Sequence, residues 1–195
     1  MKLILITGKT GSGKNRLSEL ISQKCNFLHI DIDKICHTCY DDQTITDSVT
    51  RYFGEGILTN GKVDRKKLGA IVFSDKTKLK VLNDITYNFV IGKIDKIISG
   101  TNKTVILNYV LLPDTKYWQY DSYKILAKCH DDNKRYSELV KRDNVSLDYI
   151  ISRDKNSLNY SEKDFDFIFE NDYTSQTLER SVQNIIQDIK EKLWT

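Results

Sequence analysis

Glycines and a lysine near the start of the chain have the spacing of a phosphate-binding loop. Residues 3 to 15 read LILITGKTGSGKN, which contains the pattern G-x-x-x-x-G-K. Glycine allows backbone conformations that turn N–H groups inward around a phosphate, and the lysine supplies a mobile positive charge. A helix after the loop adds the positive end of its dipole. The residues predicted to bind phosphates are Gly8, Lys9, Thr10, Gly11, Ser12, Gly13, Lys14 and Asn15.

The segments on either side of the loop favour this interpretation. The apolar run KLILIT at 2–7 has the length of a buried strand, and Leu17, Leu20 and Ile21 recur at helical spacing after the loop. A phosphate-binding loop requires a strand before it and a helix after it. The alternative is a glycine-rich turn that binds nothing, and this context argues against it.

The last residue of the pattern is unusual. Asn15 stands where such loops carry Ser or Thr, whose hydroxyl ligates Mg²⁺. An amide oxygen can coordinate Mg²⁺ directly or through a metal-bound water, and Mg²⁺ keeps several waters in most protein sites. We therefore predict that the chain uses Mg²⁺ with weakened affinity, and that Asn15 is a weak ligand that can act through water.

The composition restricts the class of protein. The chain has 195 residues, of which 39% are hydrophobic and 29% are charged, so we expect one folded domain, with or without a lid. It has no run of 18 apolar residues and no secretory signal pattern, so we predict a cytoplasmic protein without a membrane partner. A net charge of +3 is too small to argue for nucleic acid as the main partner, and it is compatible with a monomer.

The cysteines allow a second chemistry. CHTC at 36–39, with His29 nearby, is compatible with zinc binding or with a redox pair. A closed zinc site needs four ligands, however, and the sequence has no second pair of cysteines. We therefore interpret the cysteines as small apolar residues in a reducing compartment.

Strands and helices are predicted to alternate along the chain. Apolar runs predict strands at 2–7, 26–30, 104–110, 123–129 and 166–170. Helical patterns follow the loop and cover 33–40, 44–53, 65–73, 76–99, 132–142, 147–156 and 175–193. This alternation predicts an α/β fold, in which a parallel sheet is connected by helices.

Two further segments carry a family resemblance. HIDIDKICH at 29–37 places Asp31 and Asp33 after the second strand, and FGEGILTNGKVDRKKLGAIVF at 53–73 is the longest distinctive segment. Together they resemble the dephospho-coenzyme A kinase family, which has D-x-D after its second strand and the signature G-x-(I/V)-D-R-x-x-L-x-x-x-V-F. VILNYVLL, KRDNVS and DFIFEND are similar to its third strand, its lid, and its last strand with the adenine-side loop.

The resemblance implies a fold and a division of the chain. The fold is the three-layer P-loop kinase type, with a five-stranded parallel sheet in the order 2-3-1-4-5, a helical substrate-binding insert and a lid. Residues 1–195 would then form a single domain. Its core would comprise 1–31, 100–130 and 160–195, its insert 32–99 and its lid 131–157.

The resemblance also implies a reaction and its catalytic residues. The family transfers the γ-phosphate of ATP to the 3′-hydroxyl of dephospho-coenzyme A, with Mg²⁺, in the last step of coenzyme A biosynthesis. Asp33 matches the carboxylate that accepts the proton of that hydroxyl, while Lys14 and Arg142 match catalytic cations, and Arg142 and Arg153 match nucleotide-binding residues of the lid. Asp31 is interpreted equally well as the N-cap of the following helix.

Other positions depart from the family pattern. Glu138 stands where the first lid arginine is expected, and Arg135, three residues earlier, is either its substitute or a solvated charge. On the substrate side, Tyr87-Asn88 replaces a His-Pro pair, and Val110 and Pro113-Asp114 alter a P-L-L-F-E segment. Within the signature, Asp64 is predicted to be an N-cap, and the role of Arg65 is left open.

Three functions therefore remain after the sequence is considered. The first is dephospho-coenzyme A kinase, and the second is another small-molecule P-loop kinase that acts on a nucleoside or nucleotide. The third is a non-catalytic nucleotide-binding protein, which Asn15 and Glu138 suggest. A nucleotide kinase would need several arginines in the insert to bind the phosphate of its acceptor. Only Arg51 and Arg65 occur there, which argues against this function.

Overall fold

The predicted apolar strands form one parallel sheet. A computed structural model describes residues 2–155, 158 and 160–193, without the side chains of Arg153 and Leu193. The strands of the sheet lie in the order β2-β5-β1-β6-β7, and every pair is parallel. Counted along the chain within this sheet, the order is 2-3-1-4-5, as predicted. The strands are β1 (Leu3–Thr7), β2 (Leu28–Asp31), β5 (Val105–Asn108), β6 (Ser122–Cys129) and β7 (Phe167–Asn171).

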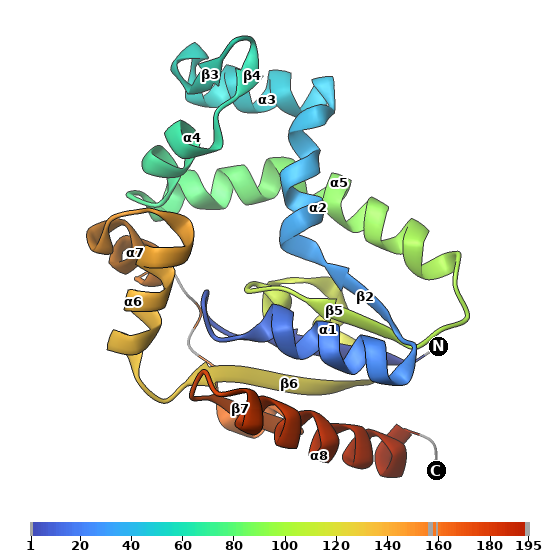
Figure 1. Cartoon of the computed structure of the whole chain (residues 1–195). Coiled ribbons are helices and arrows are strands. Elements are labelled where there is room, and N and C mark those ends of the chain that lie inside the picture. The colour runs from blue at the N-terminus through green and yellow to red at the C-terminus, as the bar shows by residue number, and fades with distance from the viewer. Residues whose placement is uncertain (1, 156–157, 159, 194–195) are drawn as a thin grey trace. The chain divides into compact units, whose positions relative to one another are not determined.

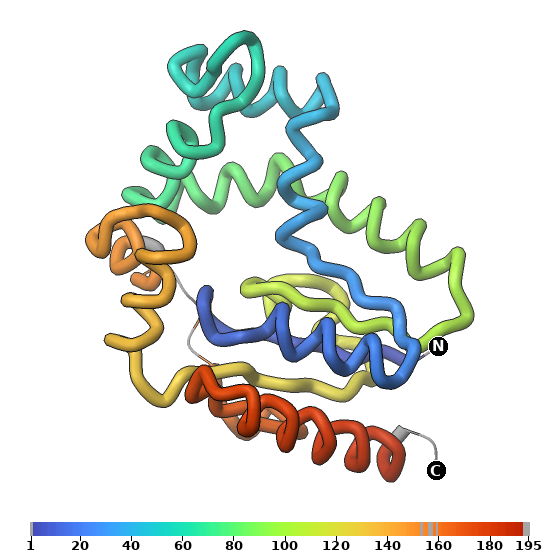
Figure 2. The backbone as a smooth tube through the Cα atoms, in the orientation of Figure 1, coloured from blue at the N-terminus to red at the C-terminus, as the bar shows by residue number. Residues whose placement is uncertain are grey.

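Two helices cover one face of this sheet (Figure 1). They are α1 (Lys14–Cys25) and α8 (Ser175–Leu193), which come from opposite ends of the chain and pack beside each other (Figure 2). Their apolar stripes meet the inward residues of β1, β5, β6 and β7. The buried residues of this core include Ile4, Ile6, Leu17, Ile21, Ile125, Phe169, Val182, Ile185 and Ile189.

The chain divides into two compact units. The first comprises residues 1–31 and 101–195, and the second comprises residues 32–100. After β6 the first unit continues with α6 (Asp132–Asp143) and α7 (Leu147–Asp154). Its short 3-10 helices are η3 (Leu112–Asp114), η4 (Lys116–Gln119) and η5 (Glu162–Asp164).

The second unit is mainly helical and has its own apolar core. The buried core residues are Val49, Ile57, Leu68, Val72 and Leu82. The helices are α2 (Ile32–Thr38), η1 (Cys39–Asp41), α3 (Gln43–Phe53), η2 (Glu55–Ile57), α4 (Arg65–Val72) and α5 (Lys76–Ser99). Between η2 and α4 lies a hairpin of β3 (Leu58–Thr59) and β4 (Lys62–Val63).

The hairpin was not predicted, although its turn has a sequence signal. Asn60 and Gly61 join the two strands and have φ angles of 51° and 74°. Asn-Gly with positive φ at both positions is the favoured two-residue hairpin turn. Each strand is only two residues long, too short for a periodic pattern to predict.

The predicted strands and helices differ from the observed ones only at their ends, while the short 3-10 helices η2, η3, η4 and η5 were not predicted. The helix expected at 33–40 is α2 followed by η1, and β5 is shorter than the segment 104–110. The helix expected at 147–156 ends at Asp154 as α7, and residue 156 lies outside the described residues. Asp64 is the N-cap of α4, as predicted, and accepts hydrogen bonds from the N–H groups of Lys66 and Lys67.

The described residues contain neither a membrane-spanning helix nor a cluster of metal-ligating side chains. Among them, no helix combines the length and the apolar character needed to cross a bilayer. The same residues contain no group of three or more His, Cys, Asp or Glu side chains placed to hold a metal ion. The four cysteines are free thiols, and the Cys39 Sγ donates to the carbonyl of Cys36 at 2.8 Å.

The α8 stripe provides a test of this core. Ile185 is fully buried, so we expect Ile185→Ala to lower the free energy of unfolding by about 2–5 kcal/mol through lost burial and a cavity. Gln183→Ala, at an exposed position of the same helix, is the control and should change stability by less than about 0.5 kcal/mol. Urea unfolding measures both. Similar losses in the two variants would contradict the packing described here.

Candidate active site

The phosphate-binding pattern forms a loop between β1 and α1, and its glycines are required by close packing. Gly8 has a φ of 144°, and a Cβ at this position would overlap the carbonyl oxygen of Ala127 on β6. Gly13 has a φ of 89°, and its Cβ would lie 2.6 Å from the Asn171 Nδ2. A side chain at either position would therefore push the loop away from the sheet.

Side chains fix the orientation of the loop. Four consecutive carbonyl groups each accept a hydrogen bond from a side chain. The donors are Lys14 Nζ to Lys9 (3.2 Å), Arg135 Nη1 to Thr10 (2.9 Å), Tyr173 OH to Gly11 (3.0 Å) and Asn171 Nδ2 to Ser12 (3.3 Å). In a trans peptide the C=O and the following N–H point in opposite directions. Among the N–H groups that follow these carbonyls, that of Ser12 donates to the Lys9 carbonyl at 3.1 Å, and the others point away from the side-chain donors.

The start of α1 completes this arrangement. Its N-cap is Gly13, which has no side chain to bond the N–H groups of the first turn. Those N–H groups and the helix dipole favour an anion in front of the helix. Lys14, which is 5% exposed, is the first residue of α1 and adds its ammonium group. The residues predicted to bind phosphates are thus assembled as one cradle, and binding itself stays a prediction.

A pocket of about 490 Å³ opens beside the loop. One wall belongs to α6, and the other to β7 and the start of α8. The lining residues are Gly11, Gly13, Lys14, Asn15, Arg16, Glu138, Leu139, Arg142, Phe169, Asn171, Tyr173, Thr174, Ser175 and Leu178. An organic group attached to the phosphates would therefore lie between α6 and the segment after β7.

The segment after β7 is held in a strained turn. Tyr173 has a φ of 66°, a conformation that costs a bulky residue about 1–3 kcal/mol. Its N–H donates to the Asn171 Oδ1 at 2.8 Å, and its hydroxyl donates to the loop at Gly11. Hydrogen bonds from the Thr174 N–H and the Thr177 hydroxyl lower the pKa of Asp172 to about 2, so this carboxylate stays ionised in the turn. The strained turn thus keeps an aromatic residue against the phosphate loop.

Of the two predicted lid arginines, the structure places the side chain of Arg142 at the pocket and does not describe that of Arg153. Arg142 lines the pocket, has a side chain that is 61% exposed and pairs with Asp143 at 2.7 Å. Arg153 belongs to α7, but its side chain lies outside the described part of the structure. Glu138 also lines the pocket and pairs with Lys141 at 3.5 Å.

Arg135 is a buried residue that supports the loop. It is 1% exposed, so its interpretation as a solvated charge is wrong. Its Nε donates to Asp132 at 2.8 Å, and both of its terminal nitrogens donate to the carboxylate of Asp154. Its bond to the Thr10 carbonyl places it on the side of the loop opposite to the following N–H group. Arg135 therefore supports the loop through the Thr10 carbonyl, and its role as a substitute for the missing lid arginine stays a prediction.

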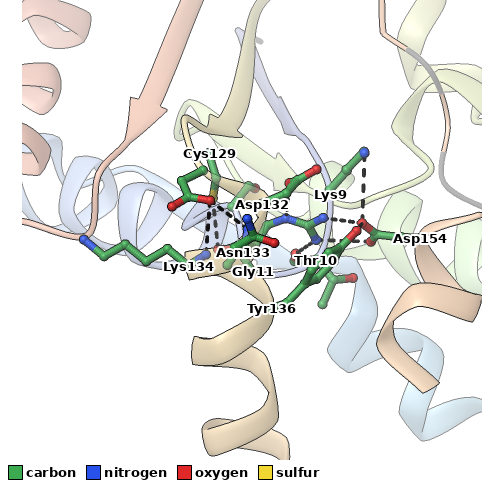
Figure 3. A network of polar contacts seen from close by, with 12 residues as sticks. Lys9, Thr10, Gly11, Cys129, Asp132, Asn133, Lys134, Tyr136 and Asp154 are labelled. Carbon is green, nitrogen blue, oxygen red and sulfur yellow. Dashed lines mark hydrogen bonds and ion pairs between the residues drawn. The ribbon is translucent and has the colours of Figure 1, made fainter. Parts of the chain in front are cut away.

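Asp154 joins three parts of the first unit (Figure 3). Besides Arg135 on α6, it accepts a hydrogen bond from the Tyr136 hydroxyl at 3.1 Å and lies 4.0 Å from the Lys9 ammonium in the loop. Burial disfavours the charged form of Arg135, but the carboxylates of Asp154 and Asp132 outweigh this effect and raise the pKa of the guanidinium. Sequence reasoning missed Asp154, because nothing in its local pattern indicates a buried partner.

Asn15 belongs to a second polar network. Its Nδ2 donates to the Asp31 Oδ2 at 2.8 Å, and its Oδ1 accepts from the Asn108 Nδ2 at 3.0 Å. Asp31 is the last residue of β2 and is 8% exposed, while Asn108 is the last residue of β5 and is 1% exposed. The sequence singled out Asn15 and Asp31 separately, and the sheet brings them together.

The remaining predicted residues belong to the second unit. Asp33 lies in the first turn of α2 and is half-buried. Arg65 is exposed at the start of α4, and Tyr87 and Asn88 are exposed on α5.

Comparison with known proteins decides the family. The model of the family described as "Dephospho-CoA kinase" matches residues 2–188. The chain belongs to the dephospho-CoA kinase family. This confirms the resemblance predicted from the sequence, and it makes the chain a member of a family of ATP-dependent kinases. The dephospho-CoA kinase of Oceanobacillus iheyensis is 30% identical over 96% of this chain and 98% of that protein.

Solved structures show the same fold. A Thermus thermophilus protein of known crystal structure has a TM-score of 0.77 at 21% identity, covering 96% of this chain and 97% of that one. A dephospho-CoA kinase from Campylobacter jejuni has a TM-score of 0.65 at 24% identity, with 98% of each chain covered. The P-loop kinase fold predicted from the sequence is therefore confirmed.

The buried pair of Arg135 and Asp154 is testable through stability. Arg135→Met leaves the buried Asp154 carboxylate without its main partner, so we expect the free energy of unfolding to fall by about 3–5 kcal/mol. The double variant Arg135→Met with Asp154→Leu should regain much of this stability, because both charges are gone. Both variants should bind ATP more weakly than the parent, because the donor to Thr10 is lost.

Urea unfolding and ATP calorimetry measure the two effects. Lys141→Met is the control, because it removes an exposed cation of the same helix and should change stability by less than about 0.5 kcal/mol. Unchanged stability and ATP affinity in Arg135→Met would contradict the supporting role of Arg135.

Proposed function

We propose that the chain transfers the γ-phosphate of ATP to the 3′-hydroxyl of dephospho-coenzyme A. The observation that carries this proposal is the loop whose four carbonyl groups are each bonded by a side chain, in a chain of the dephospho-CoA kinase family. The phosphates of ATP lie in the cradle, and the adenosine part lies in the pocket between α6 and the segment after β7. The reaction takes place in the cytoplasm, on small molecules, and the chain acts as a monomer.

The cations of the site have separate roles in this proposal. Lys14 leaves the Lys9 carbonyl and turns its ammonium to the outer phosphates of ATP. The lid comprises residues 131–157 and includes α6 and α7. Arg142 leaves Asp143 and closes over the pocket as part of this lid. Both neutralise the charge that spreads over the phosphoryl group during transfer. Arg153 supports the nucleotide from the same lid.

Asp33 acts as the base in this proposal. Its carboxylate accepts the proton of the acceptor hydroxyl, while that oxygen forms a bond to the γ-phosphorus of ATP. The bond between the γ-phosphorus and the bridging oxygen breaks, and ADP leaves with the electron pair. The helical insert, residues 32–99, binds the acceptor. Positioning and electrostatics supply most of the catalysis, as is general for phosphoryl transfer.

The residues at the mouth of the cradle fit Mg²⁺. Mg²⁺ prefers oxygen ligands and takes one or two from the protein besides phosphates and water. A carboxylate, Asp31, and an amide oxygen, Asn15, lie together beside the loop, and Asn15 lines the pocket. When bound, the metal neutralises phosphate charge and orients the γ-phosphate.

The acceptor is tested by following ADP formation. The protein is incubated with ATP, Mg²⁺ and one acceptor at a time: dephospho-coenzyme A, adenosine, or a nucleoside monophosphate. We expect turnover with dephospho-coenzyme A, because the family signature lies in the insert. Turnover with a nucleoside or nucleotide alone would instead support another small-molecule kinase. ATP binding without turnover on any acceptor would support a non-catalytic protein.

Asp33 is tested by removing its charge. Asp33→Asn should retain ATP affinity and lose about 10²–10⁴-fold in kcat, because the amide cannot accept the hydroxyl proton. Asp47→Asn, at an exposed position on α3, is the matched control and should keep the parent's kcat. Calorimetry and steady-state kinetics measure both quantities. If Asp33→Asn turned over at nearly the parent rate, another group would have to be the base.

A further inference from the structure

One side chain joins the ends of two strands beside the phosphate loop. The Tyr160 hydroxyl donates to the Val110 carbonyl at 2.6 Å. Val110 lies two residues beyond the end of β5, and Thr7 is the last residue of β1. The Thr7 hydroxyl donates toward both groups, at 3.2 Å from the Val110 carbonyl oxygen and 3.3 Å from the Tyr160 hydroxyl oxygen. Three residues that are distant in the sequence therefore meet at one point of the first unit.

This point lies at the edge of the sheet from which the phosphate loop starts. Ligands of open parallel sheets bind outside the carboxyl ends of the strands. The neighbouring strands β1 and β5 both end here, and the Tyr109 N–H extends their pairing by donating to the Ile6 carbonyl at 3.1 Å. Gly8, the first residue of the loop, follows Thr7 directly. The Tyr160 contact therefore joins the start of the loop to the chain beyond β5.

The surroundings of the Tyr160 hydroxyl keep it protonated. Burial raises the pKa of Tyr160, hydrogen bonds from the Thr7 hydroxyl and the Gly8 N–H lower it, and the charge of Asp114 raises it. The net shift of the pKa is upward, so the hydroxyl keeps the proton that it donates to Val110. Gly8 of the loop and Asp114 of the chain beyond β5 are thus both neighbours of this hydroxyl.

The segment that begins at Val110 carries a carboxylate. Residues 110–114 lead into η3, where Leu112 is fully buried and its carbonyl accepts a hydrogen bond from the Thr115 hydroxyl at 2.7 Å. Asp114 is the only charged residue of the segment, and partial burial raises its pKa. The family pattern puts this segment on the substrate side. Its orientation relative to the loop therefore decides what the acceptor meets there.

Val110 is also a position at which the segment departs from the family pattern. The pattern has proline there, and a proline ring fixes φ without any partner. Valine leaves φ freer, so the backbone needs a restraint from another residue. The hydrogen bond from Tyr160 supplies one. A proline would still fit, because Val110 is not among the described residues with positive φ, and among them its N–H donates no backbone hydrogen bond.

We propose that Tyr160 is a positioning residue for phosphoryl transfer, which fixes the segment 110–114 on the acceptor side relative to the phosphate loop. This proposal rests on the proposed function, because the group to be aligned with the γ-phosphate is the acceptor hydroxyl. Tyr160 acts through the Val110 carbonyl and contacts neither reactant. Since orientation supplies a large part of the rate in such reactions, a small shift of the segment lowers turnover more than it lowers ATP binding.

Tyr160→Phe isolates the hydroxyl. The ring keeps its edge-to-face contact with Phe165, at 6.1 Å between centroids, and the Val110 carbonyl keeps Thr7 as a donor. The variant should therefore match the parent in urea unfolding and in calorimetry with a non-hydrolysable ATP analogue. Its kcat/KM for dephospho-coenzyme A should fall by roughly 10–100-fold, because the acceptor is no longer aligned. Tyr120→Phe, at an exposed tyrosine of the same unit, is the matched control and should keep the parent's kcat/KM.

Val110→Pro offers a second restraint at the same place. On its own it should keep the parent's activity, because the ring fixes the backbone that the hydrogen bond already holds. The double variant Tyr160→Phe with Val110→Pro should recover most of the kcat/KM that Tyr160→Phe loses. Because Tyr160→Phe should leave stability unchanged, this recovery reports the position of the segment and not a repair of the fold.

The outcomes separate this role from the proposed function. A parent that does not turn over dephospho-coenzyme A would overturn the proposed function and the role of Tyr160 with it. An active parent, with Tyr160→Phe at the parent's kcat/KM, would overturn only the role of Tyr160. A comparable loss of stability or of ATP-analogue affinity in Tyr160→Phe would also overturn that role, because the hydroxyl would then support the fold or the loop. Loss of activity in Val110→Pro, or no recovery in the double variant, would overturn the action through Val110.

Discussion

The site depends on the hydrogen bonds that side chains donate to the loop carbonyls. A phosphate cradle made of backbone N–H groups exists only while the peptide planes keep one orientation, and glycine-rich segments lose much entropy when they are fixed. In this chain, each carbonyl from Lys9 to Ser12 is held by a side chain, and the donors come from α1, α6 and the end of β7. The orientation of the loop is therefore set by tertiary contacts before any ligand binds.

The contact of Arg135 with the loop requires the burial of a charged side chain, which costs desolvation energy. Burying Arg135 is favourable only because Asp132, Asp154 and the Thr10 carbonyl satisfy four of its donor contacts. Such a pair adds little to stability compared with an apolar pair of the same volume, but it permits one geometry only. The arrangement suits a place where a lid helix must meet a flexible loop in a single register.

The sequence was informative where chemistry is local. The loop, the cap at Asp64 and the family signature follow from short patterns whose residues are neighbours in the chain, and the strand order followed from the family resemblance. The roles of Arg135 and Asn108 could not be read in the same way, since their partners lie far away in sequence. Arg135 meets Asp154, 19 residues away, and Asn108 meets Asn15, 93 residues away. Only the fold reveals that one charge is buried and that one amide lies beside a carboxylate.

The contact between Arg135 and Asp154 also restricts how α6 and α7 can move relative to each other. Arg135 lies in the first turn of α6 and Asp154 is the last residue of α7, so the ion pair ties both ends of this helical hairpin to the same point. An ion pair at the base of the hairpin opposes a rigid outward rotation of both helices. It can flex at its tip, where Asn144 has a φ of 50° and the two helices join. A bend at that tip would leave the base of the hairpin in place, because the ion pair holds α6 and α7 together there.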